Sequence, residues 1–206
     1  MADYCTTTEA KALATVESGL SASSDYDAVF DVLVTAASRA IDKEVGRWEN
    51  YFYPSTSDES RYYDGSGSKV LWIDEWVSIT SVAVSDEGGL ASSDYETWSS
   101  SDYIVWPYNS TPKMKLMVDA LNGSRLEFDA YPKAVKVTGV PGYSAMPPAT
   151  VNLAARIQAA RWFMRGKQMW QTGGANAETG TLSFDKLDPD VASLLAPYKL
   201  MVEGAE

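Results

Sequence analysis

The amino-acid sequence predicts an α+β fold, a helical-bundle core that carries a small inserted antiparallel β module. Two segments with helical periodicity, residues 25–47 and 149–170, are separated by about ninety residues patterned as short strands. We therefore expect residues 1–54 and 144–206 to form the helical core, and residues 55–143 to form the β module. The C-terminal part of the core is expected to be an arm on a glycine-rich hinge.

Local signals place the ends of the predicted helices. Thr6 and Glu9 have the spacing of a capping box and predict a first helix that runs to about Ser18. Asp25 or Asp27 is expected to cap a second helix, which ends at Gly46. A long third helix is expected to begin near Thr150, after Pro147-Pro148. The last helix is predicted with Asp188 as its cap and Pro189 in its first position.

The middle of the chain alternates in the manner of strands. Apolar β-type residues recur in 70–72 and 79–84, and the run 103–106 is stopped by Pro107. Asn122-Gly123 tolerates the backbone of a tight turn, which predicts a hairpin between 116–120 and 126–128. Residues 85–101 are rich in Ser, Gly and Asp and are expected to form a solvated loop.

Composition limits the function. The chain has 206 residues, 45% of them apolar, and its 28 acids and 17 bases give a net charge of −11. A surface this acidic repels phosphate, so tight binding of DNA or RNA is not expected. The N-terminus lacks a basic region followed by an apolar run, and no apolar stretch approaches the roughly 18 residues of a membrane span. We therefore expect neither secretion by a signal peptide nor a membrane partner.

The residues that usually carry catalysis are scarce. Histidine is absent and Cys5 is the only cysteine. An internal disulfide, a Cys/His zinc site and the usual Ser-His and Cys-His nucleophile pairs are therefore excluded. We expect no enzyme activity, no catalytic residue, no metal and no cofactor. A pair of carboxylates acting as in a glycosidase has no fixed spacing, so a cryptic hydrolase stays open as a competing class.

Aromatic and cationic residues supply the candidate contact sites. Trp72, Trp76, Trp98 and Trp106 are expected to pack in the β module, with a sugar-stacking platform or an aromatic interface as the alternative. The arginines of the third helix form either a solvated face or a salt-bridged subunit contact. The candidate interface residues are Arg161, Arg165, Trp170, Phe184, Leu187, Leu194, Leu195 and Tyr198. Those from 184 onward belong to the amphipathic arm, which we expect to pack on another surface.

Several short pieces, in this order, resemble the head-tail connector, or adaptor, proteins of tailed bacteriophages. The matching pieces are Tyr4-Cys5-Thr6, Ala37-Ser38-Arg39, Val45-Gly46-Arg47-Trp48, Arg61-Tyr62-Tyr63-Asp64-Gly65, residues 135–143, Pro148, Ala159-Ala160-Arg161, residues 187–191 and residues 194–198. The likeness runs over nearly the whole chain, and the family has no catalytic signature. The loop at 85–101 is longer than the family core requires.

The resemblance implies a structural protein of the virion neck, assembled in the host cytoplasm. Such a protein forms a ring with itself, usually of twelve subunits, and joins the capsid portal protein to the tail or to a tail-completion (stopper) protein. DNA would pass through the lumen without specific binding. The alternative is a carbohydrate- or host-surface-binding module that uses exposed aromatics of the β insertion.

Overall fold

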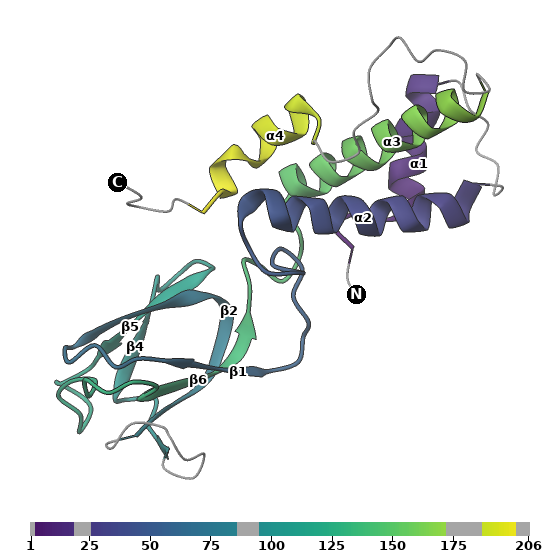
Figure 1. Ribbon diagram of the computed structural model, residues 1–206. Coiled ribbons are helices and arrows are strands. Elements are labelled where there is room, and N and C mark those ends of the chain that lie inside the picture. Colours follow the sequence, from purple (N-terminus) through teal and green to yellow (C-terminus); the bar gives the residue numbers. More distant parts are fainter. Residues whose placement is uncertain (1–2, 19–25, 86–94, 172–186, 201–206) are drawn as a thin grey trace. The chain divides into compact units, whose positions relative to one another are not determined.

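The structure is a computed structural model that describes residues 3–18, 26–85, 95–171 and 187–200 (Figure 1). The chain divides into two compact units. The helical unit comprises Met1–Phe52 and Pro147–Glu206, and the sheet unit comprises Tyr53–Met146. The hinge predicted at 171–180 lies outside the described residues from residue 172 onward. The predicted segment 182–186 and residues 86–94 of the predicted loop also lie outside them.

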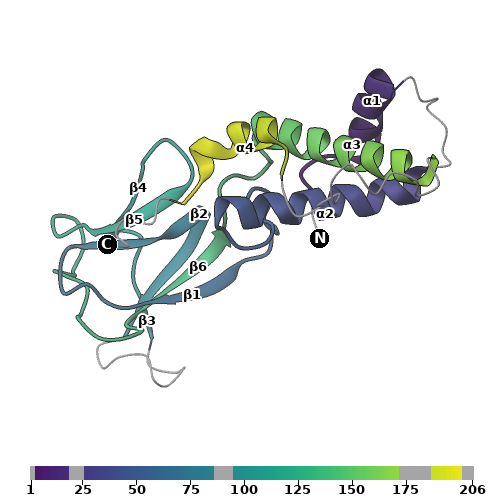
Figure 2. The same cartoon turned by 45° about the horizontal axis from the view of Figure 1, so that its top comes forward.

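In its described residues the helical unit has two long and two short helices. They are α1 (Thr7–Ser18), α2 (Asp27–Val45), α3 (Ala149–Gln171) and α4 (Pro189–Leu195), which continues into the 3₁₀ turn η2 (Ala196–Tyr198). Helices α2 and α3 lie side by side, α1 crosses α3, and α4 lies along α3 (Figures 1 and 2). No helix in the described part of the chain is both long and apolar enough to cross a membrane.

Most predicted helix ends are confirmed by their capping contacts. The Thr6 backbone N–H donates to Glu9 Oε2 at 2.8 Å, and the Glu9 N–H donates back to Thr6 Oγ1 at 3.2 Å. Gly46 ends α2 with φ of 73°, a left-handed conformation that glycine adopts without steric cost. Asp188 Oδ1 accepts from the Asp190 N–H at 3.1 Å, with Pro189 in the first turn of α4.

The predicted aspartate cap of α2 is wrong for Asp27. Tyr26 occupies the cap position without a side-chain hydrogen bond, and Asp27 is the first helical residue. Its carboxylate instead pairs with Lys11 of α1. This tertiary partner replaces the local capping contact that the sequence favoured.

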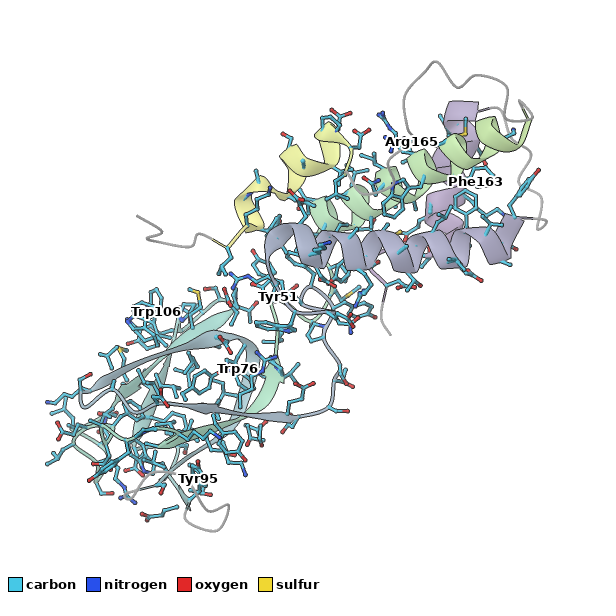
Figure 3. All side chains as sticks on the ribbon, viewed as in Figure 1. Tyr51, Trp76, Tyr95, Trp106, Phe163 and Arg165 are labelled. Atoms are coloured by element: carbon cyan, nitrogen blue, oxygen red, sulfur yellow. The ribbon has the colours of Figure 1, made fainter. Side chains whose placement is uncertain are left out.

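The core of the helical unit forms where α2 and α3 meet. Phe30, Ala37 and Ile41 recur on one side of α2 and are buried. Small residues of α3 such as Ala159 are fully buried there, which lets the two backbones approach closely. Phe30 packs on Phe163 with ring centroids 4.5 Å apart (Figure 3). Burial of this stripe holds the pair together.

The sheet unit contains a six-stranded antiparallel sheet. Its strands are β1 (Glu59–Tyr63), β2 (Val70–Val84), β3 (Glu96–Thr97), β4 (Tyr103–Trp106), β5 (Lys113–Val118) and β6 (Val135–Pro141). The order is β1-β6-β2-β5-β4, with β3 on β2, and every printed pairing is antiparallel. Strand β2 therefore pairs along its length with β6, β5 and β3.

Strand β2 is one long strand where the sequence predicted several short ones. Its register shifts between Trp76 and Ser78 and again between Ile79 and Ser81 in the pairing with β6. Each shift breaks the simple alternation of buried and exposed residues. At Gly139, opposite this irregular stretch, an added Cβ would lie 2.2 Å from the Ser78 carbonyl oxygen, so only glycine fits.

The predicted fold class is wrong about which part of the fold dominates. The chain is an α+β protein in which a six-stranded antiparallel sheet dominates, and it is not a helical-bundle core with a small β insertion. The sheet unit has its own hydrophobic cluster, which includes Trp76, Val82, Leu116, Phe128 and Val137. A segment that buries this much apolar surface for itself is a folding unit and not an appendage.

The predicted hairpin at Asn122-Gly123 is also wrong. Strand β5 pairs with β2 and β4, and residues 126–128 are not in a strand. The turn is instead fixed by Asp119, whose carboxylate accepts from Asn122 Nδ2 at 2.8 Å. Phe128 leaves this loop and stacks on Trp98 in the core, with centroids 5.1 Å apart.

Candidate functional site

The predicted interface residues of α3 and α4 lie in two environments. Arg161 is bound within its own chain, with Nη1 at 3.0 Å from Asp188 Oδ2 and Nη2 at 3.4 Å from Asp190 Oδ2. Leu195 is fully buried in the helical unit. Arg161 therefore attaches α4 to α3, and Leu195 belongs to the core of the helical unit, while a role of either residue between subunits stays a prediction.

The other predicted residues that the structure describes are half-buried. Arg165 and Leu194 are half-buried on α3 and α4 (Figure 3 labels Arg165). The Tyr198 hydroxyl lies 2.7 Å from Thr150 Oγ1, and its ring meets Phe52 edge-on. Leu187 precedes α4 and is half-buried, whereas Phe184 and the side chain of Trp170 lie outside the described residues.

We predict that Arg161→Gln loosens α4 by about 1–2 kcal/mol, because the buried Asp188 carboxylate loses its cation. Hydrogen exchange of the α4 amides should become faster while that of α2 is unchanged. Arg165→Gln, on the same helix, is the matched control and should leave α4 protected. Equal exchange of α4 in both variants would show that the pair with Asp188 does not hold the helix.

Helices α2 and α3 also border an apolar groove. It has a volume of about 480 Å³ and is lined by Val29, Val32 and Leu33 of α2 and Trp162, Phe163 and Gly166 of α3. Val32 is 69% exposed, so the apolar stripe of α2 is wider than α3 alone covers. Helix α2 also contacts α1 and α4, but this part of its apolar stripe is left open among the residues that the structure describes.

A buried polar network lies at the C-terminal end of α2. The Tyr4 hydroxyl donates to Asp42 Oδ1 and accepts from the Phe52 N–H at 3.2 Å. Asp42 Oδ2 accepts from the Asn50 N–H at 3.1 Å and lies 3.4 Å from Arg39 Nη1. Burial raises the pKa of Asp42 above its ordinary value, although these donors favour the charged form. The network joins the chain before α1 to the end of α2.

The outer face of the sheet carries a row of three cross-strand neighbours. Trp72 of β2 lies opposite Lys115 of β5, and Lys115 lies opposite Trp106 of β4. The ammonium of Lys115 is 5.2 Å from the Trp72 ring centroid and 4.4 Å from that of Trp106. Both distances are in the range of cation–π contacts. We call Trp72, Lys115 and Trp106 the Trp-Lys-Trp row.

The four tryptophans of the β module that the sequence singled out divide between the core and the outer face of the sheet. Trp76 and Trp98 belong to the core, as expected, whereas Trp72 is 65% exposed. Figure 3 shows Trp76 among the strands and Trp106 at the outside of the unit. Sequence reasoning missed Lys115, because its place between two indoles depends on strand pairing. The alternation in 113–118 was the available signal.

Among the described residues, no group of three or more Cys, Asp or Glu side chains is placed to hold a metal ion. The only cysteine, Cys5, is buried, and its burial raises the pKa of the thiol to about 12. A thiol with so high a pKa stays protonated at neutral pH and is a poor nucleophile.

Comparison with known proteins finds a solved structure with a similar fold. No protein-family model matches the chain, and no curated protein sequence matches it. The fold as a whole is shared with a solved structure in which 12% of the aligned residues are identical. The match has a TM-score of 0.52 and covers 95% of this chain and 89% of the other. That other chain belongs to the neck of an empty GTA particle, computed with C6 symmetry.

Proposed function

We propose that this chain is a structural protein of the neck of a phage-like particle. The observation that carries the proposal is the likeness to a chain of the GTA particle neck, which extends over both units and almost the full length of both chains. A match of this extent is more informative than one helix pair or one sheet would be. The bacteriophage connector pieces in the sequence independently suggest the same class.

Within the neck, we propose a ring adaptor that joins the portal to the tail or to a stopper protein. A ring of twelve copies contains a six-fold axis, so it is compatible with the C6 symmetry of the neighbour's particle. The net charge of −11 suits a channel through which DNA slides, because acidic walls repel phosphate and do not retain it.

We further propose that the chain is not an enzyme. The absence of histidine and the protonated state of Cys5 support this, since both remove common nucleophile systems. The alternative sugar-binding role finds little support in the sheet. The Lys115 ammonium lies over both Trp72 and Trp106 and occupies one face of each ring on which a sugar would stack.

Sedimentation with capsids tests the proposed role. Tail-less capsids that carry their portal should retain the protein after centrifugation, whereas capsids that lack the portal should not. Equal recovery with both kinds of capsid would indicate nonspecific adsorption. No recovery with either would remove the neck assignment.

A further inference from the structure

We infer that the outer face of β2, β5 and β4 is a contact between neighbouring copies of this chain, and that it receives an apolar, carboxylate-bearing surface of the next copy. This inference rests on the proposed ring and names one of its subunit interfaces. It concerns one face of the sheet unit, and the structure describes every residue of that face.

Strand register defines the composition of this face. Beside the Trp-Lys-Trp row, the next row along the same strands joins Val70, Met117 and Ile104. Residues two apart on a strand point to the same side of a sheet, so the two rows share one face. The intervening residues Leu71 and Leu116 point the other way, into the core. Five of the six outward side chains are therefore apolar.

An outward sheet face of this kind is unusual for a protein surface. In an antiparallel sheet with one solvated face, the outward positions are normally polar. Contiguous apolar surface on a soluble protein marks sites of association. Tryptophan is also enriched among the residues that dominate the binding energy of interfaces. The face is therefore composed like the centre of a contact.

Charge indicates what the contact receives. No carboxylate pairs with Lys115 among the described residues, and its ammonium is bordered by two indoles. A second copy has 28 acids and 17 bases, so its surface is a source of carboxylates. A carboxylate that approaches Lys115 would find a cation already oriented and partly screened from water, which strengthens the ion pair.

Symmetry then selects the type of contact. If two copies met through this face about a two-fold axis that passes close to Lys115, the two ammonium groups would approach each other and repel. A head-to-tail contact avoids this, because the face meets a different surface of the next copy. Heterologous contacts of that type close into rings when the rotation between copies is suitable.

The test compares variants of the full chain by native mass spectrometry over a range of protein concentrations. Trp72→Ala and Lys115→Glu should each weaken ring formation about tenfold or more. Lys115→Arg keeps the cation over the indoles and should assemble nearly normally. Leu121→Ala is the matched control, because Leu121 is 94% exposed in the same unit but lies outside the face. Circular dichroism should show that every variant is folded.

The outcomes separate this inference from the proposed function. If the wild-type chain forms rings and Trp72→Ala and Lys115→Glu form them equally well, the ring stands and this face is not its interface. If the two variants assemble normally but no longer sediment with portal-bearing capsids, the face binds another neck protein and the second copy is the wrong occupant. If the wild-type chain forms no ring, alone or with isolated portal, both proposals fail.

Discussion

Trp76→Ala is expected to lower the free energy of unfolding of the sheet unit by about 3–5 kcal/mol. The Trp76 side chain is fully buried in the cluster that also contains Val82 and Leu116. Its indole N–H donates to the Tyr63 hydroxyl at 3.0 Å, and the Arg61 guanidinium lies 5.8 Å from its ring centroid. Truncation removes this packing and leaves a cavity in the core beside the middle of β2.

Trp72→Ala is the matched control, since it changes the same residue type on the same strand. Trp72 is 65% exposed, so its truncation should cost the monomer less than about 1 kcal/mol. Hydrogen exchange of the β2 and β6 amides during urea denaturation measures both variants at a protein concentration where the chain is monomeric. Similar losses in the two variants would contradict the assignment of Trp76 to the core.

The second large effect is expected from Tyr4→Phe, which should destabilise the helical unit by about 1–3 kcal/mol at neutral pH. Burial raises the pKa of Tyr4, so its hydroxyl stays protonated and donates to Asp42. The variant removes that donor and also the acceptor of the Phe52 N–H. Asp42 Oδ1 then loses this donor and the Phe52 N–H loses this acceptor, whereas the ring volume hardly changes.

The pH dependence of this loss follows from the direction of the Asp42 shift. Because burial raises the pKa of Asp42 in the folded state, its contribution to stability is full at acidic pH and falls as pH rises through the folded pKa. Without the Tyr4 hydroxyl the pKa of Asp42 rises further. The penalty of Tyr4→Phe should therefore be larger at pH 7 than at pH 4, and Asp42→Asn should remove the difference.

Tyr198→Phe provides the control for this prediction. Tyr198 is half-buried and its hydroxyl bonds Thr150 at an exposed position, so its loss should cost less than about 0.5 kcal/mol at either pH. Thermal unfolding at the two pH values measures all three variants. A Tyr4→Phe penalty that is the same at both pH values would show that Asp42 does not titrate against this hydroxyl.

Local signals predicted the helices well, because their ends are fixed by residues close in sequence. Each of these ends is fixed within one turn of its helix. Thr6 bonds with Glu9, the Gly46 N–H donates to the Lys43 carbonyl, and Asp188 accepts from the Asp190 N–H. Asp27 is the exception, and its partner Lys11 belongs to another helix. The failure therefore appears where a distant residue competes with the local contact.

The strands were predicted less well, because their pairing is not local. The alternation of β2 is interrupted by register shifts, so that one strand of 15 residues resembled several short ones. Asn122-Gly123 has the composition of a hairpin turn. The chain after it does not pair with β5, however, because Phe128 packs on Trp98 in the core. These two errors made the β module look small.

The candidate interface could be predicted only in part. The sequence singled out Trp72 and Trp106 without separating them from Trp76 and Trp98, because burial depends on which face of a strand each residue occupies. It offered no reason to select Lys115, whose neighbours come from two other strands. On the helices it selected Arg161 and Leu195 as contact residues. The structure pairs Arg161 with Asp188 and buries Leu195 in the helical unit, and their role between subunits stays a prediction.

Native mass spectrometry of the purified protein, alone and mixed with isolated portal, tests the central claim most directly. The neck assignment predicts a closed ring with a mass near twelve chains, or a complex of such a ring with the portal. A chain that stays monomeric alone and also ignores the portal would contradict the assignment.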